Sequence, residues 1–142
     1  MIYLTQTDTT VGFVSTNPKL LSDAKKRDSN QPFLICVDSY LKLKQLTRIP
    51  KMHKKRVRRA RKTSFLCSNK KAIRVVKEPN HARFLKQFNF LYSTSANKNK
   101  KQYDYAFAYS KANIIIVDER GLYEVSASNI FKLGKKNIHK LR

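Results

Sequence analysis

Glycine is scarce in this sequence, and its scarcity excludes two common nucleotide-binding motifs. Three glycines occur among 142 residues, too few for a glycine-rich phosphate loop or a dinucleotide-binding glycine fingerprint. The three histidines, His53, His81 and His139, lie in basic or helix-surface contexts and indicate no catalytic triad. Any site in this chain must therefore depend on other residue types.

Acidic residues are also few, with 9 Asp plus Glu against 31 Lys plus Arg and a net charge of +22. Paired-carboxylate chemistry is poorly supplied, since residues 118–119 are the only adjacent acidic pair. A domain with this excess of charge repels itself, and a polyanion relieves the repulsion. Nucleic acid fits best, because neutralising its phosphates releases condensed counterions. An enzyme of this composition would use cations and hydroxyls on an anionic substrate.

Cysteines and long apolar runs are nearly absent. Cys36 and Cys67 lie 31 residues apart in apolar stretches, with no metal-ligand spacing, so we expect two buried reduced thiols and no metal site. No apolar run approaches the roughly 20 residues of a membrane helix. No signal-peptide pattern opens the chain. We expect a cytoplasmic protein with no membrane partner.

The rest of the composition supports a folded core. Hydrophobic residues make up 41% of the chain, with seven Tyr and eight Phe, and the length suits one domain over residues 1–142. Helix starts are indicated at Asn17-Pro18, Ser39 and Pro79. Strand-like segments alternate with these helices and predict an α/β domain with a mixed sheet. The strand-like segments are residues 2–4, 33–37, 63–67, 72–76, 90–92, 113–117 and 122–125.

Some local expectations are more specific. The first helix should bury Leu20, Leu21 and Ala24 and break up around residues 28–30. Residues 103–112 fit either a helix or a strand. The three consecutive isoleucines at 114–116 predict a strand buried on both faces.

Residues 51–62 carry eight Lys or Arg in twelve positions, and residues 132–142 form a basic tail. As a helix, the segment would be cationic nearly all round, with Met52, Val57 and Ala60 left to pack. We favour RNA contact over a merely solvated helix. No aromatic stacking platform is evident beside it, so sequence-specific reading is not expected. The candidate RNA-binding residues are Lys54, Lys55, Arg58, Arg59, Arg61 and Lys62.

Three polar segments could carry chemistry: TDTTVGF (7–13), KKRDSNQPF (25–33) and TSAN (94–97). A lysine point charge and an arginine fork suit a triphosphate, and Lys25 and Arg27 would share a face if extended. Ser95 and Asn97 can bond phosphate or ribose, unless they form an ordinary polar turn. The alternative for the two cations is a solvated helix end.

Two further features concern a small polar substrate. Thr7 and Thr9 could bind it through their hydroxyls. Arg74 lies between Ile73 and Val75, so it points inward toward an anionic partner unless it is a surface strand residue.

In this order the segments resemble the YrdC-like family. That family carries Pro-Thr-(Glu/Asp)-Thr-x-x-Gly-Leu, then Lys-x-Arg-Pro-x-x-x-Pro-Leu, then Ser-Ala-Asn. Residues 72–75 are similar to its strand with a buried-facing arginine, and residues 115–118 to its late valine-rich strand ending in Asp. The resemblance spans residues 2–134.

The resemblance implies a single-domain YrdC-like fold, a twisted mixed parallel/antiparallel sheet flanked by helices around a basic cavity. It implies an L-threonylcarbamoyladenylate synthase that uses L-threonine, bicarbonate or CO2, and ATP, with Mg²⁺ carried by the triphosphate. The product would pass to threonylcarbamoyl-transferase machinery that modifies tRNA. The implied roles are catalysis by Lys25 and Arg27; nucleotide binding by Arg27, Gln31, Thr63, Ser95, Asn97 and Lys132; and threonine binding by Thr7, Arg74 and Ser93.

The sequence also departs from the family pattern. The Pro-Gly-Pro-x-Thr segment is replaced by RARKTSFL (59–66), in which only Thr63 corresponds. Asp28 stands where proline is usual, Ile114 where serine is usual, and Lys132 where an arginine is usual. Two alternatives stay open: a non-catalytic YrdC-like protein that binds tRNA, rRNA or ribosomal precursors, and a basic ribosome-associated protein whose matches are accidental. The enzyme needs its polar residues to converge on one cavity.

Overall fold

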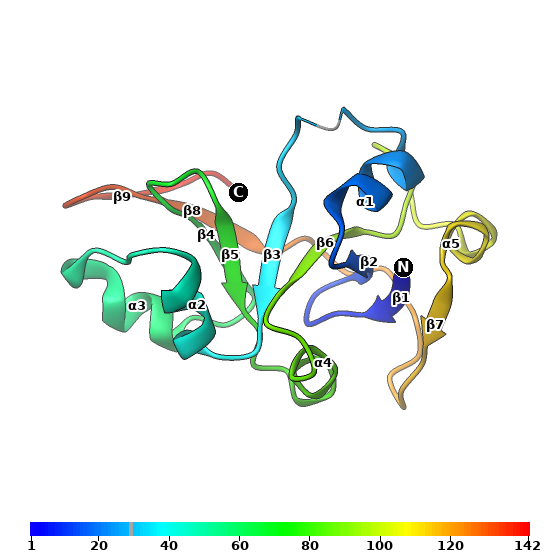
Figure 1. Ribbon diagram of the computed structural model, residues 1–142, viewed down its shortest axis with the longest axis horizontal. Helices are drawn as coiled ribbons and strands as arrows, with labels where there is room; N and C mark the ends of the chain where they lie inside the picture. The colour runs from blue at the N-terminus through cyan, green and yellow to red at the C-terminus, as the bar shows by residue number, and fades with distance from the viewer. Residues whose placement is uncertain (29) are drawn as a thin grey trace. The chain divides into compact units, whose positions relative to one another are not determined.

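Residues 1–28 and 30–142 are described by a computed structural model (Figure 1). Contacts between residues divide the chain into two units. The first unit comprises residues 1–33 and 91–127, and the second comprises residues 34–90 and 128–142. Ser29, within the predicted helix break at 28–30, lies outside the described residues. One domain over residues 1–142 stays a prediction.

The first unit is built on four strands in the order β7-β1-β2-β6. Strand β1 pairs antiparallel with β2 and parallel with β7, and β2 pairs antiparallel with β6. Helix α1 packs on β2 and β6. The elements are β1 (Tyr3–Gln6), β2 (Val11–Ser15), α1 (Pro18–Lys25), β6 (Leu91–Ser95), α5 (Tyr105–Lys111) and β7 (Ile114–Ile116).

The start of α1 is as predicted. The Asn17 side chain accepts a hydrogen bond from the Lys19 N–H at 3.0 Å, and Pro18 occupies the first turn. Leu21 and Ala24 are buried as predicted, while Leu20 is half-buried. The left-handed Lys26 (φ 49°) ends the helix. The ambiguous residues 103–112 contain helix α5, which is capped by Asp104.

Two predictions for the first unit are wrong, and one strand was missed. Ile114 and Ile115 are 40% and 38% exposed, because β7 lies at the end of the strand order instead of inside the sheet. Residues 122–125 are not a strand. The Tyr123 N–H donates to the Gln6 side chain at 2.9 Å, and the Val125 N–H to the Thr10 hydroxyl at 3.0 Å. Strand β2, which holds Gly12, was not predicted.

The second unit has five strands in the order β3-β5-β4-β8-β9. Pairs β3·β5 and β4·β8 are parallel, while β4·β5 and β8·β9 are antiparallel. Both units thus carry mixed sheets, which confirms the α/β class. The elements are β3 (Leu34–Val37), α2 (Tyr40–Leu46), η1 (Lys51–His53), α3 (Lys54–Arg59), β4 (Thr63–Leu66), β5 (Ala72–Val75), α4 (Pro79–Leu85), β8 (Asn129–Leu133) and β9 (Ile138–Lys140).

Helix starts in the second unit are confirmed. Strand β8 was not predicted, and β9 was predicted only as part of the basic tail at residues 132–142. Ser39 caps α2 by accepting the Lys42 N–H at 3.2 Å, and Pro79 lies in the first turn of α4. Cys36 and Cys67 are buried free thiols, as predicted.

The helix-surface prediction is wrong for His81, while His53 is buried within its basic segment. His53 and His81 are 4% and 1% exposed, and the His53 ring lies 2.9 Å from the Gly134 carbonyl oxygen. Met52, predicted to pack, is 64% exposed, because η1 buries the neighbouring His53 instead. Within residues 1–28 and 30–142, no helix has the length and apolar character needed to cross a bilayer.

Candidate active site

Lys25, the last residue of α1, is buried and reaches the segment at the end of β6. Its Nζ donates to the Ser95 carbonyl oxygen at 2.8 Å and to Asn97 Oδ1 at 3.1 Å, and also contacts the Asn97 carbonyl oxygen. An ammonium has three donors, so these contacts account for all of them. Lys25 therefore joins the second and third motif segments, and its immediate role is to hold the Ser95–Asn97 loop.

The environment of Lys25 disfavours its charge. Burial, and to a lesser extent the charge of Arg27, lowers the pKa of Lys25 from 10.5 to about 8. At 7% exposure, Lys25 is not part of a solvated helix end. The stretch is not extended either, because Lys25 is helical and Lys26 is left-handed.

Arg27 is half-buried and lies close to the predicted nucleotide-binding Gln31. Its Nε donates to Gln31 Oε1 at 2.7 Å and its Nη2 to the Pro32 carbonyl oxygen at 2.9 Å. The guanidinium carbon lies 4.4 Å from the centroid of the Phe33 ring. Burial lowers the pKa of Arg27. Because a guanidinium has five N–H donors, Arg27 keeps further donors for an anion.

Thr7 and Ser93 come together around Gly12. A Cβ atom on Gly12 would lie 3.0 Å from Thr7 Cγ2, 3.8 Å from Ser93 Oγ and 2.9 Å from the Thr94 carbonyl oxygen. The Thr7 hydroxyl donates to the Thr10 carbonyl oxygen at 2.5 Å and accepts the Thr9 N–H at 3.1 Å. Glycine is therefore required here by close approach, and the Thr7 hydroxyl shapes its own loop.

Arg120 is a positioning residue that sequence reasoning missed. Its Nη1 donates to the Thr7 carbonyl oxygen at 2.8 Å and its Nη2 to the Gln6 carbonyl oxygen at 2.9 Å. Nε and Nη2 also bond the two Asp118 carboxylate oxygens, at 3.0 and 2.7 Å. The only signal in the sequence was an arginine two residues after the aspartate that follows β7. Arg120 fixes the backbone of the Thr7 loop.

Three predicted site residues belong to the second unit. Arg74 on β5 is 3% exposed, which confirms that it points inward. Its Nη1 lies 3.4 Å from Ser64 Oγ and its Nη2 3.9 Å from Cys36 Sγ. Thr63 donates to the Arg61 carbonyl oxygen at 2.8 Å, and Lys132 on β8 is exposed. Thr7, Lys25, Arg27, Gln31, Ser93, Ser95 and Asn97 belong to the first unit.

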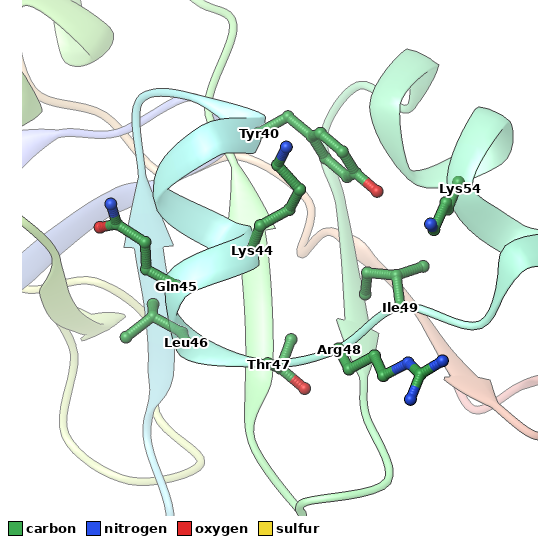
Figure 2. A pocket seen from close by; sticks show the side chains of 8 residues that line it. All are labelled: Tyr40, Lys44, Gln45, Leu46, Thr47, Arg48, Ile49 and Lys54. Carbon is green, nitrogen blue, oxygen red and sulfur yellow. The ribbon is translucent and has the colours of Figure 1, made fainter.

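The predicted RNA-binding residues are all exposed. Four of the six, Lys54, Lys55, Arg58 and Arg59, lie on α3, so the segment is helical for much of its length. A pocket of about 360 Å³ lies beside it in the second unit (Figure 2). Its lining includes Lys54 but none of the predicted nucleotide- or threonine-binding residues. In the described ranges, no group of three or more His, Cys, Asp and Glu side chains is placed to hold a metal ion.

Comparisons with known proteins agree with the fold. A family model described as telomere recombination, covering the Sua5, YciO and YrdC proteins, matches residues 4–142. A search of the curated proteins gave no match.

Three solved structures are similar to this chain. The crystal structure of P. abyssi Sua5 complexed with L-threonine has a TM-score of 0.77 at 19% identity, covering 99% of this chain and 49% of that chain. The solution structure of MTH1692 from Methanobacterium thermoautotrophicum has a TM-score of 0.70 at 16% identity, covering 99% and 79%. Full-length HypF in its phosphate- and nucleotide-bound form has a TM-score of 0.77 at 11% identity, covering 99% and 26%. The chain thus spans about half the length of the Sua5 chain that it matches.

Proposed function

This chain belongs to the Sua5/YciO/YrdC family, and we propose that it is an L-threonylcarbamoyladenylate synthase. The threonine amine attacks CO2 and releases a proton to solvent, or condenses with bicarbonate with loss of water, and gives a carbamate. A carbamate oxygen then attacks the α-phosphorus of ATP. The bond from that phosphorus to the bridging oxygen breaks, and pyrophosphate leaves with the electron pair. The product feeds the threonylcarbamoyladenosine modification of tRNA.

The observation that carries the proposal is the contact of Lys25 with the Ser95–Asn97 loop, with Arg27 two residues further on. Lys25 fixes the loop through main-chain carbonyl oxygens, and the Ser95 side chain remains exposed toward a ligand. Arg27 keeps donors for the triphosphate and neutralises the charge that develops on pyrophosphate. Mg²⁺ would arrive on the triphosphate. The further nucleotide contacts that we propose are Gln31, Thr63, Asn97 and Lys132.

The proposed threonine contacts are Thr7, Ser93 and Arg74. A guanidinium suits a threonine carboxylate, because its parallel N–H donors match the two carboxylate oxygens. That P. abyssi Sua5 was crystallised with L-threonine supports this part of the proposal. That HypF has a phosphate- and nucleotide-bound form supports a nucleotide on this fold. The protein would act mainly by positioning reactants.

A second candidate function is RNA binding without catalysis. The exposed cations of residues 51–62 favour it, since a solvent-facing cationic helix suits phosphate contact. The two functions differ in the role of Arg27. The synthase requires Arg27 to bind the triphosphate of ATP, whereas an RNA-binding protein without catalysis does not.

Pyrophosphate release from ATP tests the synthase. We expect release by the purified chain to require both L-threonine and bicarbonate, and to fall at least about 100-fold in Arg27→Ala, as for the loss of a charge-stabilising donor. Arg83→Ala, an exposed arginine on α4, is the matched control and should keep full activity. ATP binding without release would identify a non-catalytic relative. If the chain neither binds ATP nor releases pyrophosphate, the basic surface would carry the function.

A further inference from the structure

We propose that the pocket beside α2 and α3 binds a phosphodiester of single-stranded RNA. This inference does not depend on the synthase. The pocket measures about 360 Å³, within the size range of small-ligand sites and large enough for about one nucleotide. It is lined by Tyr40, Lys44, Gln45, Leu46, Thr47, Arg48, Ile49 and Lys54.

The charge of the pocket suits an anion. Lys44 on α2, Arg48 in the connection after it and Lys54 on α3 are all exposed, so their charged groups meet solvent (Figure 2). None of the eight described lining residues is acidic. Three cations around one hollow repel one another, and a phosphate among them removes that repulsion.

Tyr40 supports these cations from one wall. Its ring centroid lies 5.7 Å from Lys44 Nζ and 5.2 Å from the guanidinium carbon of Arg58. A ring attracts a cation without neutralising it, so both groups keep their charge for a ligand. The Tyr40 hydroxyl is buried and has no hydrogen-bond partner within the described residues. Figure 2 shows it pointing toward the Lys54 side of the pocket.

The pocket extends the basic segment at residues 51–62. Lys54 belongs to both, and Arg58 on the same helix contacts the Tyr40 ring. Lys44 and Arg48 lie outside the segment and were not predicted. A polyanion that follows α3 therefore meets a recess for one of its phosphates. The sequence prediction found no aromatic residue beside the basic segment, and Tyr40 is one. Because Tyr40 supports cations from within the pocket wall and does not stack on bases, binding should still tolerate any base sequence.

Two exposed apolar residues favour a single strand over a duplex. Leu41 on α2 and Met52 on η1 are 63% and 64% exposed. Unpaired bases offer apolar faces that such residues can contact, whereas a duplex covers those faces. A recessed phosphate site also suits a flexible chain better than a flat bilayer.

Fluorescence anisotropy with a labelled 12-nucleotide RNA of mixed sequence, from 50 to 300 mM KCl, tests the proposal. The pocket variant is Lys44→Gln with Arg48→Gln. The matched control is Lys135→Gln with Lys136→Gln, two exposed lysines between β8 and β9 that remove the same charge. We expect the pocket variant to bind at least about 10-fold more weakly, with a salt slope lower by about 1.4 for two lost contacts to a single strand. The control should weaken binding less than about 3-fold.

A third variant separates shape from charge. Tyr40→Leu leaves every charge in place, and we expect it to weaken RNA binding about 5-fold because its cations lose their support. Thermal unfolding of each variant checks that it is folded. If Tyr40→Leu unfolds, Tyr40→Phe is used to test the hydroxyl alone, and an affinity unchanged from wild type would show that the ring suffices.

Several results would overturn the proposal. The proposal is overturned if the wild-type protein does not bind the RNA. It is also overturned if the pocket and control variants lose RNA affinity equally. Vesicles with anionic lipids, or duplex RNA, are tested in parallel. If the pocket variant loses affinity for the vesicles or for duplex RNA and keeps its affinity for single-stranded RNA, the pocket binds that other ligand and the proposal is wrong. Pyrophosphate release should be unchanged in the pocket variant, so failure of one proposal leaves the other intact.

Discussion

Each unit holds a set of three cationic side chains, and the two sets differ in their nearest partners. In the first unit, Lys25, Arg27 and Arg120 donate to main-chain and side-chain oxygens of the protein itself. In the second unit, Lys44, Arg48 and Lys54 surround a pocket and face solvent. Net charge therefore does not indicate the role of a particular cation. Its nearest oxygens do: a cation bonded to carbonyls fixes a loop, while an exposed one remains available to a partner.

The largest expected effect is a pH dependence of stability that comes from Lys25. Its pKa is about 8 in the folded chain against 10.5 ordinarily, so between these values the unfolded chain binds more protons. Stability from this group therefore rises with pH across that window. At 1.36 kcal/mol for each pKa unit, the free energy of unfolding should rise by up to roughly 3 kcal/mol relative to Lys25→Met. Urea unfolding from pH 7.5 to 10.5 measures it.

The neighbouring lysine supplies the control for that experiment. Lys26→Met removes an exposed charge at the same helix end and keeps the left-handed backbone (φ 49°). Its difference from wild type should stay flat over the same pH range. A flat difference for Lys25→Met as well would contradict the burial of that ammonium.

Removing Arg120 should have the next largest effect. Arg120→Ala removes the guanidinium that donates to the Gln6 and Thr7 carbonyl oxygens and to the Asp118 carboxylate, which still accepts the backbone N–H of residue 120. Losing hydrogen bonds to a charged group costs about 2 kcal/mol, to be measured by urea unfolding. Lys19→Ala, at an exposed position in the same unit, should change stability by less than about 0.5 kcal/mol.

A double-mutant cycle sharpens the Arg120 prediction. Arg120→Ala combined with Asp118→Asn should show a coupling of about 1 kcal/mol or more, because the two residues interact directly. Additive single effects would mean that Arg120 does not hold the Thr7 loop through Asp118.

Gly12→Ala should destabilise the first unit by about 1 to 2 kcal/mol through overpacking. The new methyl group would come within 2.9 Å of the Thr94 carbonyl oxygen and 3.0 Å of Thr7 Cγ2. Thr7→Ser removes that second atom, so the double variant should recover part of the loss. Urea unfolding of the single and double variants decides whether the two residues touch.

The smallest effect is expected in the second unit. Lys44→Gln and Arg48→Gln should each change the free energy of unfolding by less than about 0.5 kcal/mol, because neither side chain is buried. Thermal melts at low and high salt check this. A loss comparable to that of Arg120→Ala would mean that the pocket cations support the fold.

Local signals carried much of the fold prediction. Asn17-Pro18, Ser39 and Pro79 start helices because caps and first-turn prolines act within a few residues. Where burial decides, the sequence was ambiguous. Three consecutive isoleucines predicted a strand inside the sheet, yet β7 lies at the end of the strand order. The position of a strand in a sheet depends on pairing with residues far away in the sequence, which a local pattern does not contain.

The site was predicted in part for a similar reason. Motif order led to Lys25 and Asn97, and the structure brings them together across 72 positions. Motif order could not reveal that the main partners of Lys25 are backbone carbonyl oxygens, because every residue has such an oxygen. Arg120 was missed because its contacts to the Thr7 loop are to backbone oxygens, and the aspartate two residues before it was the only signal in the sequence.

The exposed edge of β7 has a consequence for handling the protein. Unpaired strand edges with apolar side chains, such as Ile114 and Ile115, favour pairing between molecules. The net charge of +22 opposes such association at low ionic strength. At 1 M salt, electrostatic repulsion extends only about 3 Å. The high-salt wash that strips bound polyanions during purification should therefore also promote self-association, and a low concentration of protein at that step should prevent it.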